Sequence, residues 1–253
     1  MTIRVMASRH SAFYSPLLCA VKFLRDEGLD VPYSVLQPGQ RSHSLISESA
    51  VDIMQSAVSS NWSARAEGVR ELPVHFAQIN RRDGFFLTAP APDPAFDWRK
   101  LEGATILADH GAQPLAMLKY ALAYNGVNSA RLVRSGPADY GHYQLPAPGD
   151  EIVASVGTSM PPVAFSSLCC ARAYQDAEDY GRFLDAFTRG KEFARTAPPE
   201  EVAAAGAGFF PDVPRAKLAD AVRRYQGLGT WEGGIEIPRE LYEQAMRVFG
   251  VTE

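Results

Sequence analysis

The stretch that decides the fold runs from residue 51 to residue 68 and reads VDIMQSAVSSNWSARAEG. Its first four residues form a short apolar run that is typical of a buried strand. A polar turn follows over residues 55–61, and it ends in Ser59, Ser60 and Asn61, which are residue types that cap helices. Residues 62–68 then predict a helix that ends at a glycine. This strand–turn–helix unit is the repeating element of an α/β domain with a mostly parallel sheet.

The same alternation continues in both directions along the chain. We predict strands at residues 3–7, 33–36, 74–79, 85–89, 105–108, 131–133, 152–156 and 163–170. We predict helices from Ser15 onward, at 42–49 and at 114–125, and a largely helical last third from residue 174. Residues 136–149 contain several Pro and Gly without any hydrophobic period, which predicts a long irregular loop.

Composition excludes several classes of protein. The 25 Lys and Arg against 29 Asp and Glu give a net charge of −4, which argues against a nucleic-acid-binding face. Three cysteines provide neither a zinc site nor a disulfide framework, and their expected role is that of small buried side chains. No nucleotide-binding, metal-binding or nucleophile motif is present, so we expect no catalytic residue, no metal and no cofactor.

One uncharged run, residues 152–171, has the length of a membrane span. It contains Gly157, Pro161 and Pro162, which favour a strand, a turn and a second strand over a lipid-spanning helix. We therefore expect no membrane insertion. No secretory signal is visible after Met1, so the expected location stays open. It is the periplasm or cell envelope if a signal lies upstream of Met1, and the cytoplasm if Met1 is the native start.

Candidate site residues follow the predicted strands, because open α/β sheets bind ligands at the carboxyl ends of their strands. Helix N-termini and arginines supply donors for anions. The residues expected to bind ligand are Arg9, His10, Ser11, Tyr14, Ser56, Ser59, Ser60, Asn80, Arg81, His110 and Gly111. Ordinary helix capping and solvated surface arginine are the alternative interpretations of the same residues.

Several segments in order carry a resemblance to a known family. They include SESAVDIMQSAVSS at 47–60, FDWRKLEGATILADHGAQPLAMLKYALAYNGV at 96–127 and FSSLCCARAYQDAEDYGRFLDAFTRGKEFA at 165–194. The chain resembles the solute-binding proteins of nitrate, sulfonate, taurine and thiamine-precursor ABC importers. That superfamily also contains the thiamine-pyrimidine synthase and enzymes of the menaquinone pathway.

The resemblance implies a two-lobed, hinged α/β fold of the periplasmic-binding-protein type (type II) that closes on ligand in the cleft between the lobes. Residues 1–86 and 174–253 would form the first lobe and residues 87–173 a second, trimmed lobe. The synthase's pyridoxal-binding Lys and consumed His correspond here to Ser56 and Ser60, so its chemistry is not expected.

The expected function is therefore reversible binding of a small, anionic solute, with an ABC importer permease as partner. The first alternative is a cytoplasmic enzyme on the same fold, of the thiamine-precursor or menaquinone-pathway type. In that case His10, Asp109 and His110 would supply general acid and base. The second alternative is an intracellular sensor domain.

Overall fold

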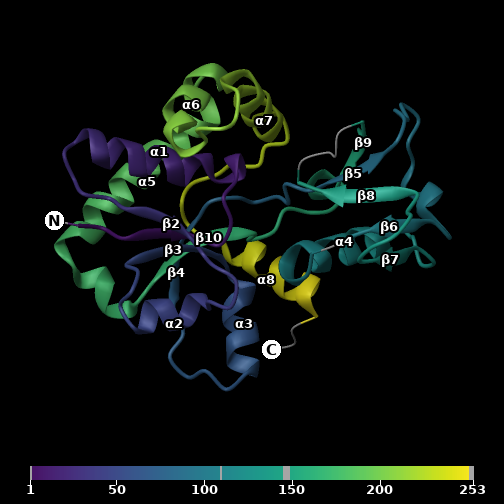
Figure 1. The fold of residues 1–253 in the computed structure, drawn as a ribbon. Coiled ribbons are helices and arrows are strands. Elements are labelled where there is room, and N and C mark those ends of the chain that lie inside the picture. Colours follow the sequence, from purple (N-terminus) through teal and green to yellow (C-terminus); the bar gives the residue numbers. More distant parts are fainter. Residues whose placement is uncertain (1, 109, 145–148, 251–253) are drawn as a thin grey trace. The chain divides into compact units, whose positions relative to one another are not determined.

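The computed structural model describes residues 2–108, 110–144 and 149–250 (Figure 1). The chain divides into two compact units. Unit 1 comprises Met1–Arg81 and Ala164–Tyr242, and unit 2 comprises Arg82–Val163 and Glu243–Glu253. The chain thus passes between the units three times. The division predicted from the sequence changed lobes after residues 86 and 173 and kept the whole C-terminal tail in the first lobe.

The sheet of unit 1 has the strand order β2-β1-β3-β10-β4. Its strands are β1 (Val5–Ala7), β2 (Tyr33–Val35), β3 (Ile53–Ala57), β4 (Val74–Gln78) and β10 (Ser166–Cys170). β1 runs parallel to β2 and β3, whereas β10 runs antiparallel to both β3 and β4. β3 and β4 are therefore parallel to each other, and β10 alone reverses direction within this described sheet.

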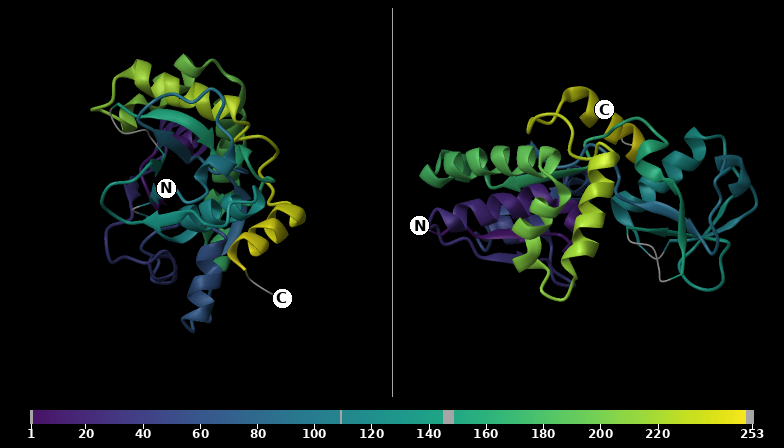
Figure 2. Two further views of the ribbon diagram at one scale, coloured as in Figure 1. Left: turned by 90° about the vertical axis from the view of Figure 1, so that its right-hand side faces the viewer. Right: turned by 90° about the horizontal axis from the view of Figure 1, so that it is seen from above.

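Helices cover both faces of this sheet (Figure 1). Those of unit 1 are α1 (Ser15–Asp26), α2 (Ser42–Ser47), α3 (Ser59–Ala66), α5 (Glu178–Thr196), α6 (Pro199–Gly206) and α7 (Arg215–Gly227). Figure 2 shows α1 and α5 side by side. They approach closely at Gly190, where a Cβ atom would lie 2.6 Å from the backbone oxygen of Pro16. Glycine is the residue that permits this approach.

The core of unit 1 follows from the apolar runs in the sequence. Ile3 just before β1, Val5 on β1, and Leu17 and Leu18 on α1 are fully or almost fully buried. The three cysteines are buried as free thiols, as predicted from their number and spacing. Close packing of such side chains, more than local propensity, holds short three-residue strands in place.

The sheet of unit 2 has the order β7-β6-β8-β5-β9. Its strands are β5 (Phe86–Ala89), β6 (Thr105–Leu107), β7 (Arg131–Val133), β8 (Tyr140–Tyr143) and β9 (Glu151–Ser155), and its helix α4 spans Ala112–Tyr124. β8 corrects the sequence prediction, which placed an irregular loop over residues 136–149. The strand has no aliphatic run, and its place between β6 and β5 supplies the hydrogen bonds that make it regular.

The last helix, α8 (Arg239–Phe249), contains the third passage between the units, after Tyr242. Within unit 2, Gln244 on α8 donates a hydrogen bond to the hydroxyl of Tyr120 on α4, at 3.1 Å. Among the described residues, no helix combines the length and the apolar character that crossing a membrane requires.

Candidate functional site

The turns that follow β1, β3 and β4 lie at one edge of the unit 1 sheet, because these three strands are parallel. Most of the predicted site residues lie at this edge, which we call the carboxyl edge. They are Arg9, His10, Ser11, Ser56, Ser59, Ser60, Asn80 and Arg81. Parallel strand order therefore brings together, within one unit, segments that are about 20 to 70 residues apart in the sequence.

His10 uses both of its ring nitrogens inside the protein. Nε2 lies 2.7 Å from the backbone oxygen of Phe209, and Nδ1 lies 3.3 Å from the hydroxyl of Tyr33. A carbonyl oxygen only accepts, so Nε2 carries the proton in this contact. The ring also packs on Phe210, with centroids 4.2 Å apart. His10 thus ties the turn after β1 to the segment after α6, and these contacts occupy its donor and acceptor.

Ser11 and Asn80 shape the segment that leads into α1. Ser11 Oγ accepts a hydrogen bond from the backbone N–H of Phe13 and so caps a 3-10 turn, Ala12–Tyr14. The side-chain amide of Asn80, which is fully buried, donates to the backbone oxygen of Phe13 at 2.9 Å. Asn80 Oδ1 is buried and has no hydrogen-bond partner among the described residues. Tyr14, at the end of this turn, is buried against Phe13.

The structure places the serines at the end of β3 differently from the sequence prediction. Ser56 lies within the strand instead of in a turn after it, and its hydroxyl donates to Ser60 Oγ at 3.0 Å. Ser60 Oγ donates to the backbone oxygen of Ala57 at 2.7 Å. The predicted side-chain cap over residues 59–61 is wrong, because α3 already begins at Ser59 and its N-cap, Val58, offers no side-chain hydrogen bond.

Two of the arginines near these strand ends have guanidinium groups without a hydrogen-bond or ion-pair partner among the described residues. Within the described part of the chain, neither Arg9 nor Arg81 has a side-chain hydrogen bond or an ion pair, and Arg81 is only half exposed. By contrast, Arg41 pairs with Glu67, and Arg82 donates to the backbone oxygen of Gly157 at 2.8 Å. A guanidinium without an internal partner is an available bidentate donor for an oxyanion.

The two remaining predicted residues, His110 and Gly111, belong to unit 2. His110 Nε2 lies 2.8 Å from Nδ1 of His142 on β8, and the Phe85 ring packs on both imidazoles with centroids 4.8 and 4.9 Å away. Gly111 is the extended N-cap residue of α4. Asp109, weighed as an acid or base in the enzyme alternative, lies outside the described residues.

Sequence reasoning missed His142 because it assigned residues 136–149 to a loop. His142 is fully buried, and burial, assisted by His110, lowers its pKa to about 3. The imidazole is therefore neutral at physiological pH and orients His110 without carrying charge. Tyrosines at 140 and 143, a residue type favoured in strands, are the signal that could have revealed this element.

The described residues hold no grouping of three or more His, Cys, Asp and Glu side chains able to bind a metal ion. Burial raises the pKa of the Cys19 and Cys170 thiols to about 12, so neither forms a thiolate at neutral pH. Among the described side chains, the carboxyl edge offers hydrogen-bond donors and positive charge, which suit binding better than nucleophilic chemistry.

Comparisons with known proteins place this geometry in context. No protein-family model matches the chain. A curated relative is YtlA of Bacillus subtilis strain 168, named as a candidate binding protein, which is 23% identical over 251 residues, covering 88% of this chain and 75% of YtlA.

Several solved structures resemble this chain in fold over almost its whole length. The aliphatic sulphonate binding protein SsuA of Escherichia coli matches with a TM-score of 0.70 at 13% identity, covering 99% of this chain and 91% of SsuA. This chain has the periplasmic-binding-protein fold. The alkanesulfonate-binding SsuA of Xanthomonas axonopodis pv. citri, solved bound to MOPS, matches with a TM-score of 0.64 at 13% identity, covering 97% and 89% of the two chains. A Bordetella bronchiseptica RB50 structure matches with a TM-score of 0.69 at 19% identity, covering 100% and 89%.

The fold predicted from the resemblance is thereby confirmed. Identities this low concern the arrangement of the backbone. One solved neighbour, from Staphylococcus aureus, is the ligand binding component of an ABC-type import system, and another, from Parabacteroides distasonis, is an ABC transporter. Proteins that share a fold can bind different ligands, because the side chains of the site determine which ligand is bound. The ligand class of this chain therefore has to be inferred from its own site residues.

Proposed function

We propose that this chain is a substrate-binding protein of the ABC-importer type that captures a small organic anion at the carboxyl edge of the unit 1 sheet. The observation that carries the proposal is the pair of uncommitted guanidinium groups, Arg9 and Arg81, at the strand ends of this edge. The side chains of Ser11 and Asn80 hold the turn after β1 through hydrogen bonds to the backbone of Phe13. The backbone that carries the two arginines is therefore ordered before a ligand binds.

Sulfonates and carboxylates are the first ligands to test. Two of the solved neighbours bind sulfonates according to their names, and either anion matches the planar fork of arginine. His110 and Gly111 of unit 2 remain proposed contributors to the same function. The proposed partner is an importer permease, since one solved neighbour is the ligand binding component of an ABC-type import system.

The test is a ligand screen by thermal shift, followed by calorimetry on the hits. Ligand at 100 times its dissociation constant stabilises the folded state by about 2.7 kcal/mol, a clear rise in melting temperature. Arg81→Gln and Arg9→Gln should each weaken an anion hit by roughly tenfold, the cost of about 1.4 kcal/mol. Arg215→Gln, which changes an exposed arginine of α7 outside the carboxyl edge, is the matched control.

The outcomes separate the candidate functions. Undiminished affinity in both variants would overturn the proposed site. Recovery of a chemically altered ligand would favour an enzyme on this fold instead of a binding protein. Hits among amines alone would leave the fold unchanged and reject the anionic ligand class.

A further inference from the structure

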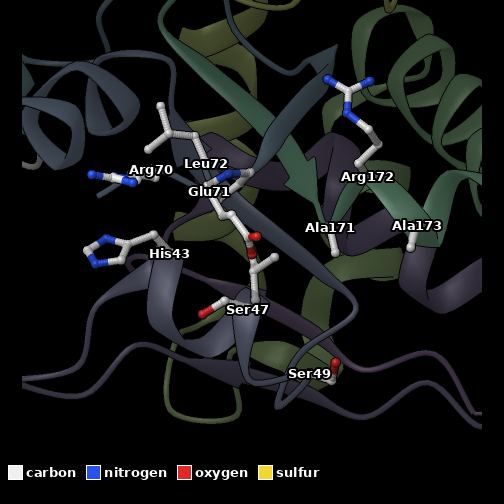
Figure 3. Close-up of a pocket in the computed structure, with 11 residues that line it drawn as sticks. His43, Ser47, Ser49, Arg70, Glu71, Leu72, Ala171, Arg172 and Ala173 are labelled. Atoms are coloured by element: carbon white, nitrogen blue, oxygen red, sulfur yellow. The ribbon is translucent and has the colours of Figure 1, made fainter. Parts of the chain in front are cut away.

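Unit 1 has a pocket of about 580 Å³ at the edge of its sheet opposite the carboxyl edge (Figure 3). Its walls come from α2 and the residues before β3, from the segment before β4, and from the residues after β10. Because β10 is antiparallel to β3 and β4, these three segments meet at the same edge. The volume lies within the usual range for small-molecule sites, about 300–1,000 Å³.

The lining of this pocket is partly apolar. Ile46 is buried and belongs to a hydrophobic cluster with Val51, Met54 and Cys169. Leu72 and Pro73 line the pocket from the segment before β4. The pocket therefore offers apolar surface that is continuous with the core, which suits a ligand with a hydrocarbon or aromatic body.

Four titratable side chains also line the pocket: His43, Arg70, Glu71 and Arg172. In the part of the chain that the structure describes, none of the four has a hydrogen bond or an ion pair. Figure 3 shows Arg70 and His43 on one side and Arg172 on the other. Two guanidinium groups against one carboxylate leave a charge of +1, which matches a monoanion.

The base of the pocket is held in place by neighbouring contacts. Ser49 has a positive φ of 52°, and its backbone oxygen accepts from Arg4 Nη1 at 2.6 Å. Arg4 is itself bound in bidentate fashion to Asp52, with distances of 2.5 and 2.9 Å. On the other wall, the Asn61 side chain donates to the backbone oxygen of Pro73 at 2.8 Å. A site fixed in this way loses little entropy on binding.

We infer that this pocket is a second binding site, for a small organic monocarboxylate with an apolar body. Arg70 and Arg172 pair with the carboxylate, and the wall of Ile46 and Leu72 contacts the apolar body. Glu71 opposes the bound anion and limits the site to a single negative charge. This inference is independent of the proposed function, since the pocket shares no residue with the carboxyl edge.

Fluorine NMR of 4-fluorobenzoate titrated with the full chain tests the site, with 4-fluorobenzamide as the neutral probe of equal shape. We expect saturable binding of the carboxylate that is at least fivefold tighter than that of the amide. Arg70→Gln and Arg172→Gln should each weaken it several-fold, and the double variant should abolish it. Glu71→Gln should strengthen it, because a repulsive charge is removed.

Arg215→Gln, at an exposed arginine of α7, is the control variant and should leave 4-fluorobenzoate binding unchanged. Equal binding of 4-fluorobenzoate and 4-fluorobenzamide, or full affinity in the folded Arg70→Gln, Arg172→Gln double variant, would overturn the inference. Absence of carboxylate binding at millimolar protein concentration would do the same. Loss of binding only in Arg81→Gln would assign the carboxylate to the carboxyl edge instead.

Discussion

His110 Nε2 lies 2.8 Å from His142 Nδ1, and this contact joins a predicted site residue to a strand that the sequence did not reveal. His142 is fully buried and its other nitrogen, Nε2, has no hydrogen-bond partner among the described residues. A buried imidazole in this position is stable only when neutral. The orientation of His110 therefore depends on His142 staying unprotonated.

This contact predicts a specific pH dependence of stability. Burial lowers the pKa of His142 to about 3, so the unfolded state binds the extra proton between about pH 6.5 and pH 3. The stabilisation is present above pH 6.5 and is lost as the pH falls. His142→Asn retains a partner for His110 without titrating. As the pH falls below 6.5, the unfolding free energy of His142→Asn should decrease less steeply than that of the wild type. The two slopes should differ by about 1.4 kcal/mol per pH unit, the value for one proton. Urea unfolding from pH 4.5 to 7 measures this.

The control is Asn125→Ala, which changes a half-buried side chain of unit 2 that does not titrate and that donates a hydrogen bond to the backbone oxygen of Ser159. Its stability should follow the wild-type pH profile more closely. Identical slopes for wild type and His142→Asn would show that His142 does not titrate as a buried neutral group.

A second pH prediction concerns Asp83, which is fully buried. Burial raises the pKa of its carboxyl to about 7, although Oδ1 accepts a hydrogen bond from the backbone N–H of Phe85. The folded state then binds more protons than the unfolded state between about pH 4 and pH 7, so stability falls as pH rises through that window.

Asp83→Asn should be more stable than wild type at pH 8, by on the order of 1 kcal/mol or more, and similar in stability to wild type near pH 4. Denaturant midpoints at the two pH values measure this, with exposed Asp212→Asn as control. A larger gain at pH 4 than at pH 8 would contradict the assignment.

Lys191 is a buried cation that joins two parts of unit 1. Its Nζ donates to the backbone oxygens of Gln78 at 2.8 Å and Gly234 at 2.6 Å. Burial lowers the pKa of its ammonium to about 8. Lys191→Met leaves both carbonyls without this donor, so we expect a loss of about 2–4 kcal/mol of unfolding free energy. Lys22→Met, which removes an exposed ion pair with Asp26, should cost less than about 1 kcal/mol. Comparable losses in the two variants would refute the role of Lys191.

Two glycines of α5 provide a matched pair for packing. At Gly190 a Cβ atom would lie 2.6 Å from the backbone oxygen of Pro16 and 2.8 Å from the backbone nitrogen of Ala20. At Gly181 a Cβ atom would meet nothing within 4 Å. Gly190→Ala should therefore destabilise unit 1 by roughly 1–3 kcal/mol, the usual cost of overpacking. Gly181→Ala should stabilise it by about 0.5–1 kcal/mol, since alanine favours the helix. Melting temperatures that shift in the same direction would contradict this packing of α1 on α5.

The candidate site was partly predictable from the sequence. Arg9, Ser11 and Arg81 were expected at one sheet edge because they follow apolar runs, and parallel strands end together. Local sequence could not reveal that Phe209 and Tyr33 occupy both nitrogens of His10. Such contacts depend on how the chain returns after about 200 residues, which no local pattern encodes.

The sequence by itself determined most of the segments that become strands and helices, because burial of apolar runs and helix periodicity are local properties. The uncharged run at residues 152–171 was rightly interpreted as two strands, β9 and β10. Only the tertiary structure decided that these strands join different sheets, with β9 on β5 and β10 between β3 and β4. Strand pairing depends on hydrogen bonds and side-chain contacts with distant segments, and β8 became a strand for the same reason.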